Sequence, residues 1–133
     1  MKTVLFACIH NAGRSQMAAA WFNKLADPSK ARAVSAGTAP GSTVHPEVVT
    51  VMGEVGVDLA GQTPRFLSDE LASSATLLVT MGCGEACPHV PGLERDDWPL
   101  EDPKQKPLAR VREIRDDVER RVRQLIEARH WGP

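Results

Sequence analysis

A thiol, a guanidinium and a hydroxyl group lie close together near the N-terminus of the chain, in the stretch FACIHNAGRSQM (residues 6–17). Five residues separate Cys8 from Arg14, and Ser15 follows directly. A thiolate is a nucleophile, and a guanidinium can hold two oxygens of a tetrahedral oxyanion at once. The hydroxyl of Ser15 is placed to donate to the sulfur. These residue types at this spacing predict a nucleophilic cysteine beside an anion-binding site.

The segment CIHNAGRS between an apolar run and a helical pattern is expected to form a strand-to-helix turn. Its backbone N–H groups would converge on one point, reinforced by the positive end of the helix dipole. Gly13 permits a tight turn, and Asn11 tolerates left-handed backbone geometry. The positive potential of these N–H groups and of the helix dipole is also expected to favour the thiolate form of Cys8. We therefore predict that the substrate is bound by the whole loop, which consists of Cys8, Ile9, His10, Asn11, Ala12, Gly13, Arg14 and Ser15.

Two further cysteines, Cys83 and Cys87, lie in the stretch MGCGEACP (residues 81–88). Its glycines and proline predict a loop. Three cysteines in a reducing compartment are more readily explained as catalytic, metal-binding or buried groups than as structural disulfides. A zinc site would need two ligands besides this pair, and only His89 is nearby, so we expect no metal.

The totals indicate one ordinary domain spanning residues 1–133. Hydrophobic residues make up 42% and charged residues 25% of the chain, which is a globular composition. The net charge of -1 argues against general affinity for nucleic acid or anionic lipid. The sequence shows neither a signal peptide nor an apolar run of membrane-spanning length. We expect a cytoplasmic monomer.

Alternating strand and helix patterns predict an α/β fold, a four-stranded parallel sheet with helices on both faces. Sites in such sheets form at the carboxyl ends of strands, where Cys8 and Cys83 would meet. Basic residues of the last helix alternate with acidic ones and are expected on a solvated face. The expected strands cover 3–7, 31–37, 76–82 and part of 93–98, and the expected helices begin at Ser15, near 45, after Ser68 and at Leu108.

The stretch VLFACIHNAGRSQMAAAW resembles the N-terminal signature of low-molecular-weight protein tyrosine phosphatases and of the arsenate reductases that share their fold. The resemblance continues in the same order over nearly the whole chain. It runs through VSAGT (34–38), GVDLAGQTPR (56–65), LLVTM (77–81) and DWPLEDP (97–103).

This resemblance implies roles for the remaining site residues. Asp102, followed by Pro103, matches the general acid that protonates the leaving oxygen. Cys83 and Cys87 resemble the redox loop of the arsenate reductases, so the implied reaction is reduction of arsenate to arsenite for arsenic detoxification. A disulfide would pass from Cys8–Cys83 to Cys83–Cys87 and be reduced by thioredoxin. The chain contains 0 tyrosines. This absence is more consistent with a narrow pocket for an inorganic anion than with a phosphotyrosine pocket.

Two alternatives remain open at this point. The chain could be a low-molecular-weight tyrosine phosphatase, or a reductase that uses mycothiol or bacillithiol with a glutaredoxin-like protein. Phosphate or sulfate is expected to occupy the loop as well. We expect no tightly bound cofactor beyond the external thiol reductant. Some relatives bind potassium through acidic residues at the positions of Ala19 and Arg65, so no potassium site is carried over, whereas Asn11 and Ser35 are expected to brace the loop.

Overall fold

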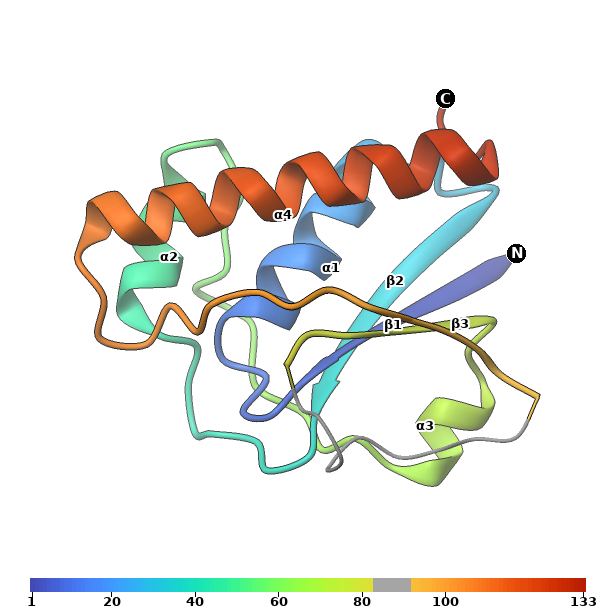
Figure 1. Cartoon of the computed structure of the whole chain (residues 1–133), viewed down its shortest axis with the longest axis horizontal. Coiled ribbons are helices and arrows are strands. Elements are labelled where there is room, and N and C mark those ends of the chain that lie inside the picture. The colour runs from blue at the N-terminus through green and yellow to red at the C-terminus, as the bar shows by residue number, and fades with distance from the viewer. Residues whose placement is uncertain (83–91) are drawn as a thin grey trace.

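A parallel sheet of four strands forms the centre of the protein, whose computed structural model describes residues 1–82 and 92–133 (Figure 1). The strand order is β2-β1-β3-β4, and every neighbouring pair is parallel. The strands are β1 (Lys2–Cys8), β2 (Ala31–Gly37), β3 (Leu77–Thr80) and β4 (Glu94–Asp97). The predicted fold class is confirmed.

The central strand β1 is apolar from Val4 to Cys8 because helices cover both of its faces. Side chains of successive strand residues point to opposite faces. Accordingly, Val4 and Phe6 belong to the larger hydrophobic cluster, and Leu5 and Ala7 belong to the smaller one on the other face. All four are fully buried.

Three helices cover the face with the larger cluster, and the fourth helix covers the other face (Figure 1). The larger cluster includes residues of α1 (Arg14–Leu25), α2 (Pro46–Gly53) and α4 (Leu108–Arg129). The smaller cluster includes Ala72 of α3 (Asp69–Ser73). Helices on both faces are therefore a feature of the structure, as the sequence predicted.

The helix boundaries follow local signals in the sequence. Pro46 occupies the first turn of α2, where its missing N–H costs nothing. The Ser68 hydroxyl accepts a hydrogen bond from the backbone N–H of Leu71 (3.0 Å) and so caps α3 as predicted. In α4, the expected ion pairs at four-residue spacing are present, between Arg121 and Asp117 and between Arg123 and Glu119.

One basic residue of α4 does not lie on a solvated face, which corrects the sequence-based expectation. Arg115 is 9% exposed and donates from Nη1 to the backbone oxygen of Val51 (2.9 Å) and to the carboxylate of Glu54 (2.9 Å). Charge alternation along a helix does not reveal which arginine faces a neighbouring helix. Arg115 faces α2, so it joins two helices.

The C-terminal end of the chain also contributes to the core. Trp131 is 8% exposed, and its ring packs against that of Phe22 with centroids 5.9 Å apart. The backbone N–H of Asp27 donates to the carbonyl of Trp131 (2.8 Å). Within residues 1–82 and 92–133, no helix has the length and apolar character needed to cross a membrane.

Candidate active site

The carboxyl end of β1 leads directly into the loop that carries the expected nucleophile. Cys8 is the last residue of the strand, is 2% exposed and is a free thiol. Its Sγ lies 2.8 Å from Oγ of Ser15, which stands in the first turn of α1. The strand and the helix are both packed into the core, so they hold the two atoms together from opposite ends of the loop.

Asn11 holds the hydroxyl that contacts the sulfur. Its Nδ2 donates to Oγ of Ser15 (2.8 Å), and this oxygen is also the hydrogen-bond partner of Sγ of Cys8. Asn11 has a φ of 51°, the left-handed conformation expected from the sequence. Gln16 donates from Nε2 to both the backbone oxygen and Oδ1 of Asn11 (3.1 and 3.2 Å). The sequence analysis did not identify Gln16, because its contact with Asn11 exists only in the folded chain.

The backbone carbonyl groups of the loop are bonded to a neighbouring segment. The segment that follows β2 donates backbone hydrogen bonds to the loop oxygens, which pair as Thr38 to Cys8, Ala39 to Ile9, Gly41 to His10 and His45 to Ala12. Among the residues that the structure describes, no acceptor is found for the backbone N–H groups of residues 9–13. The loop thus offers a run of free donors, and such an arrangement binds anions.

Arg14 lies at the edge of this loop with its guanidinium held in place. The residue is 7% exposed, and Nη1 donates to the backbone oxygen of Leu100 (3.1 Å). Nη2 lies 3.8 Å from Oδ2 of Asp102. Gly82 lies against the same guanidinium, because a Cβ at that position would be 2.6 Å from Nη1. Gly82 and the segment 100–102 precede and follow residues 83–91 in the sequence, and both therefore lie beside the guanidinium of Arg14.

Asp102 is positioned by its own turn and by its proline neighbour. Its Oδ1 accepts a hydrogen bond from the backbone N–H of Lys104 (3.0 Å), and its side chain is 43% exposed. Pro103 packs directly over Gly13, where a Cβ would lie only 2.7 Å from the proline Cγ. Residue 13 therefore has no room for a side chain unless the Asp102–Pro103 turn moves.

His45 forms the other wall beside Gly13. Its Cδ2 would be 3.3 Å from a Cβ on that glycine. Burial lowers the pKa of His45 below its usual value of 6.5, and the negative charge of Asp102 partly opposes this shift. Glu47 also opposes it, whereas Lys104 and His10 act in the same direction as burial. The imidazole therefore loses its proton at a lower pH than an ordinary histidine.

Trp98 is mostly buried and borders a surface cavity between β4 and α4, together with Arg121 and Leu125. It is 6% exposed, its ring lies 5.5 Å from that of Phe6, and its Nε1 donates to Asp96 (3.2 Å). It is therefore part of the core beneath β4.

The remaining predicted residues have different outcomes. Cys83, Cys87 and His89 fall outside the described residues. In the described part of the chain, no three His, Cys, Asp or Glu residues are grouped to hold a metal ion. Ala19 is buried and Arg65 is exposed, and both line a cavity together with Ser35 and Gln16.

The chain matches a family of known proteins. A model of the low molecular weight phosphotyrosine protein phosphatase family matches residues 3–130. A Halobacterium salinarum protein provisionally named an arsenate reductase is 40% identical over 126 residues, which are 92% of this chain and 89% of that protein. A glutaredoxin arsenate reductase of Synechocystis is 36% identical over 129 residues, covering 95% and 97%.

A solved structure is similarly close. The thioredoxin-dependent arsenate reductase of Corynebacterium glutamicum superposes with a TM-score of 0.83 at 38% identity. The match covers 96% of this chain and 61% of the Corynebacterium chain, so this protein spans somewhat under two thirds of that relative.

Proposed function

This chain belongs to the low molecular weight phosphotyrosine protein phosphatase family, and from that premise we propose that it is an arsenate reductase that uses Cys8 as its nucleophile. The observation that carries the proposal is the 2.8 Å contact between Sγ of Cys8 and Oγ of Ser15, beside a loop whose backbone N–H groups find no acceptor among residues 1–82 and 92–133. The relatives named above are described as arsenate reductases, which favours the same substrate here.

The first step joins the sulfur to arsenic. Arsenate binds to the loop N–H groups and to the guanidinium of Arg14, and the Cys8 thiolate attacks the arsenic atom. A sulfur–arsenic bond forms while an arsenic–oxygen bond breaks. Asp102, in its protonated form, transfers a proton to the departing oxygen, which leaves as water. Arsenic remains in the pentavalent state throughout this step.

The second step reduces arsenic. The thiolate of Cys83 attacks the sulfur of Cys8, the sulfur–arsenic bond breaks, and its electron pair stays on arsenic as arsenite leaves. This gives a Cys8–Cys83 disulfide. Cys87 then attacks Cys83, which frees Cys8 as a thiolate and moves the disulfide to Cys83–Cys87. Two thiols thus supply the two electrons, and Gly82, which precedes Cys83 in the sequence, lies against Arg14.

An external thiol must reduce the final disulfide. We propose thioredoxin as this donor, as the description of the Corynebacterium relative states for that protein. The Synechocystis relative is named for glutaredoxin, so a glutaredoxin coupled to a small thiol is the competing donor. In that case the small thiol attacks the arsenic-bound Cys8, and Cys83 and Cys87 are dispensable.

The phosphatase alternative uses the same loop but needs a wall for an aromatic ring. The sequence contains 0 tyrosines, and Trp98 is part of the core. Both observations favour a small inorganic anion over an aryl phosphate. Phosphate and sulfate have the same tetrahedral shape as arsenate and are expected to compete for the loop. The physiological role that follows is arsenic detoxification.

Turnover with defined electron donors tests the proposal. The protein is incubated with arsenate, NADPH and either thioredoxin with its reductase or glutathione with glutaredoxin and its reductase, and NADPH oxidation is followed. We expect turnover with thioredoxin that is abolished by Cys8→Ser, Cys83→Ser or Cys87→Ser. Turnover that only Cys8→Ser abolishes would select the small-thiol route. Hydrolysis of p-nitrophenyl phosphate that is more efficient than arsenate reduction would identify a phosphatase instead.

A further inference from the structure

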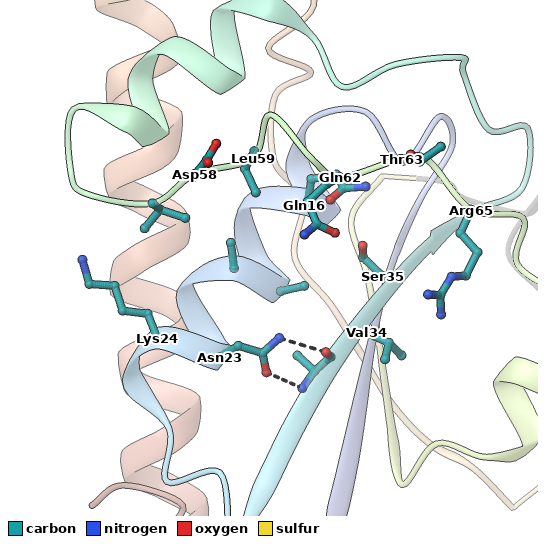
Figure 2. A pocket seen from close by; sticks show the side chains of 14 residues that line it. Gln16, Asn23, Lys24, Val34, Ser35, Asp58, Leu59, Gln62, Thr63 and Arg65 are labelled. Atoms are coloured by element: carbon teal, nitrogen blue, oxygen red, sulfur yellow. Dashed lines mark hydrogen bonds between the residues drawn. The ribbon is translucent and has the colours of Figure 1, made fainter.

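A polar cavity of about 430 Å³ lies behind the catalytic loop, between α1, the strand β2 and the segment 57–65 (Figure 2). Its walls include Gln16, Lys24, Ser35, Asp58 and Gln62. Because β2 is at the edge of the sheet, the cavity runs along backbone groups that have no strand beside them.

Along the edge of β2 that faces away from β1, the backbone groups of two residues have hydrogen-bond partners. The side-chain amide of Asn23 bonds both backbone groups of Ala33: Nδ2 donates to the carbonyl (3.0 Å), and Oδ1 accepts from the N–H (2.8 Å). Gly37 is paired as well, since its N–H donates to Arg65 (2.8 Å) and its carbonyl accepts from Leu67 (2.8 Å). Figure 2 shows the Asn23 pair at the lower end of the cavity.

Ser35 stands midway between these two pairs. In a parallel strand, the N–H and the C=O of one residue point to the same side, and alternate residues share that side. Because Ala33 and Gly37 face the free edge, Ser35 faces it too. In the described ranges 1–82 and 92–133, no partner is found for its N–H or its C=O. The cavity therefore contains a donor and an acceptor spaced for one amide group.

We propose that this cavity binds a small molecule with a primary carboxamide at one end and an amino-acid group at the other. The carboxamide pairs with the backbone of Ser35 in the way that Asn23 already pairs with Ala33. This inference goes beyond the proposed reaction and does not depend on it.

The side of the cavity away from Ser35 has charges that suit a zwitterion. Lys24 and Asp58 both line it, and Figure 2 shows the two side chains on that side, apart from each other. Nζ of Lys24 donates to the backbone oxygen of Val55 (2.8 Å), which leaves two of its three hydrogens for a carboxylate. One oxygen of Asp58 accepts from the backbone N–H of Ala60 (2.9 Å), and the other can accept from an ammonium group.

The cavity is joined to the catalytic loop through Gln16 and through Arg65, whose backbone N–H donates to Oδ1 of Asn11 (2.9 Å). Gln16 lines the cavity and donates to Asn11, whose Nδ2 in turn donates to Ser15. A ligand that contacts Gln16 therefore acts on the residue that orients the hydroxyl at Cys8. Binding is expected to alter the environment of the Asn11 side-chain amide.

Amide NMR of the ¹⁵N-labelled protein tests the proposal with L-glutamine as the probe. L-methionine serves as the matched ligand, because it has a similar length and the same amino-acid group but lacks the carboxamide. We expect L-glutamine to shift the Ser35 N–H and the Asn11 side-chain amide, with a smaller shift at Val34, whose N–H points toward β1. Lys24→Met should weaken this binding about tenfold, since it removes a charged hydrogen bond and keeps the aliphatic stem. Lys30→Met, a lysine that bonds Gly132 away from the cavity, should leave it unchanged.

Two results would overturn the site. The first is an unmoved Ser35 N–H up to the solubility limit of L-glutamine, or an equal shift with L-methionine. The second is equal affinity in the Lys24→Met variant and the wild type. Neither readout requires arsenate or turnover, so failure here leaves the proposed reaction untouched.

Discussion

The sulfur of Cys8 and the hydroxyl of Ser15 lie 2.8 Å apart, although they stand on different secondary-structure elements. Asn11 donates to the same hydroxyl from within the loop and so holds it beside the sulfur. The loop is therefore arranged before any substrate arrives.

Replacement of Ser15 by alanine should slow arsenate reduction without unfolding the protein. The variant loses one hydrogen bond to a charged sulfur, which corresponds to a fall of about 10- to 100-fold in kcat/KM. Ser73→Ala is the matched control, because Ser73 bonds only a backbone oxygen on the exposed side of α3. Comparison of steady-state rates and thermal unfolding separates the two effects. Equal losses in both variants would contradict the role of Ser15.

A methyl group on Gly13 should displace the turn that carries Asp102. The new Cβ would lie 2.7 Å from Cγ of Pro103, so Gly13→Ala is expected to lower kcat about tenfold or more while phosphate binding is retained. Pro103→Ala removes the clashing ring. The double variant should recover part of the activity that Gly13→Ala loses. If the two losses simply add, Pro103 does not rest on Gly13 as described.

Glu54 makes the stability of the protein depend on acid pH. Hydrogen bonds from Arg112 and Arg115 lower the pKa of Glu54 from 4.5 to about 2 in the folded chain. A depressed carboxylate pKa contributes stability above the unfolded value of 4.5, and this contribution is lost as the pH falls toward 2. Urea unfolding across this range should show a flatter pH dependence for Glu54→Gln.

The control for that experiment is Glu127→Gln, which removes a carboxylate that forms no ion pair within the described residues. Salt should reduce the difference between Glu54→Gln and the wild type, since Arg112 and Glu54 are both partly exposed. An unchanged pH slope in Glu54→Gln would contradict the ion pairing between α2 and α4.

His45 should report the position of Asp102 by titration. Burial lowers the pKa of His45, and the carboxylate of Asp102 raises it in part. Asp102→Asn is therefore expected to lower the pKa of His45 further, as followed by imidazole resonances in NMR. Glu101→Gln, one position earlier in the chain, should have no comparable effect. A pKa that stays constant or rises in Asp102→Asn would place the carboxylate away from the loop.

Much of the fold could be predicted from the sequence because its signals are local. The continuous apolar run of β1 reflects burial on two faces, and Ser68 and Pro46 mark helix starts by their own chemistry. The loop from Cys8 to Ser15 was recognisable for the same reason, since all of its reactive groups are close in sequence.

Long-range contacts were less accessible. Arg115 has the same local pattern as its exposed neighbours, and only the packing of α4 against α2 selects it for burial. Likewise, Gln16 acquires its role because a left-handed Asn11 turns its polar atoms toward α1. Pro103 packs against Gly13, although the two residues are far apart in the chain. No periodic pattern in the sequence predicts such a contact.

The most direct measurement is a single turnover in the absence of any external reductant. Fully reduced protein is mixed with arsenate, and the arsenite released and the thiols consumed are counted by mass spectrometry with peptide mapping. The thiol relay predicts one arsenite per chain and a disulfide between Cys83 and Cys87, with neither product in Cys8→Ser. Release of no arsenite from the wild-type protein, or the same yield from Cys8→Ser, would contradict the assignment of Cys8 as the nucleophile.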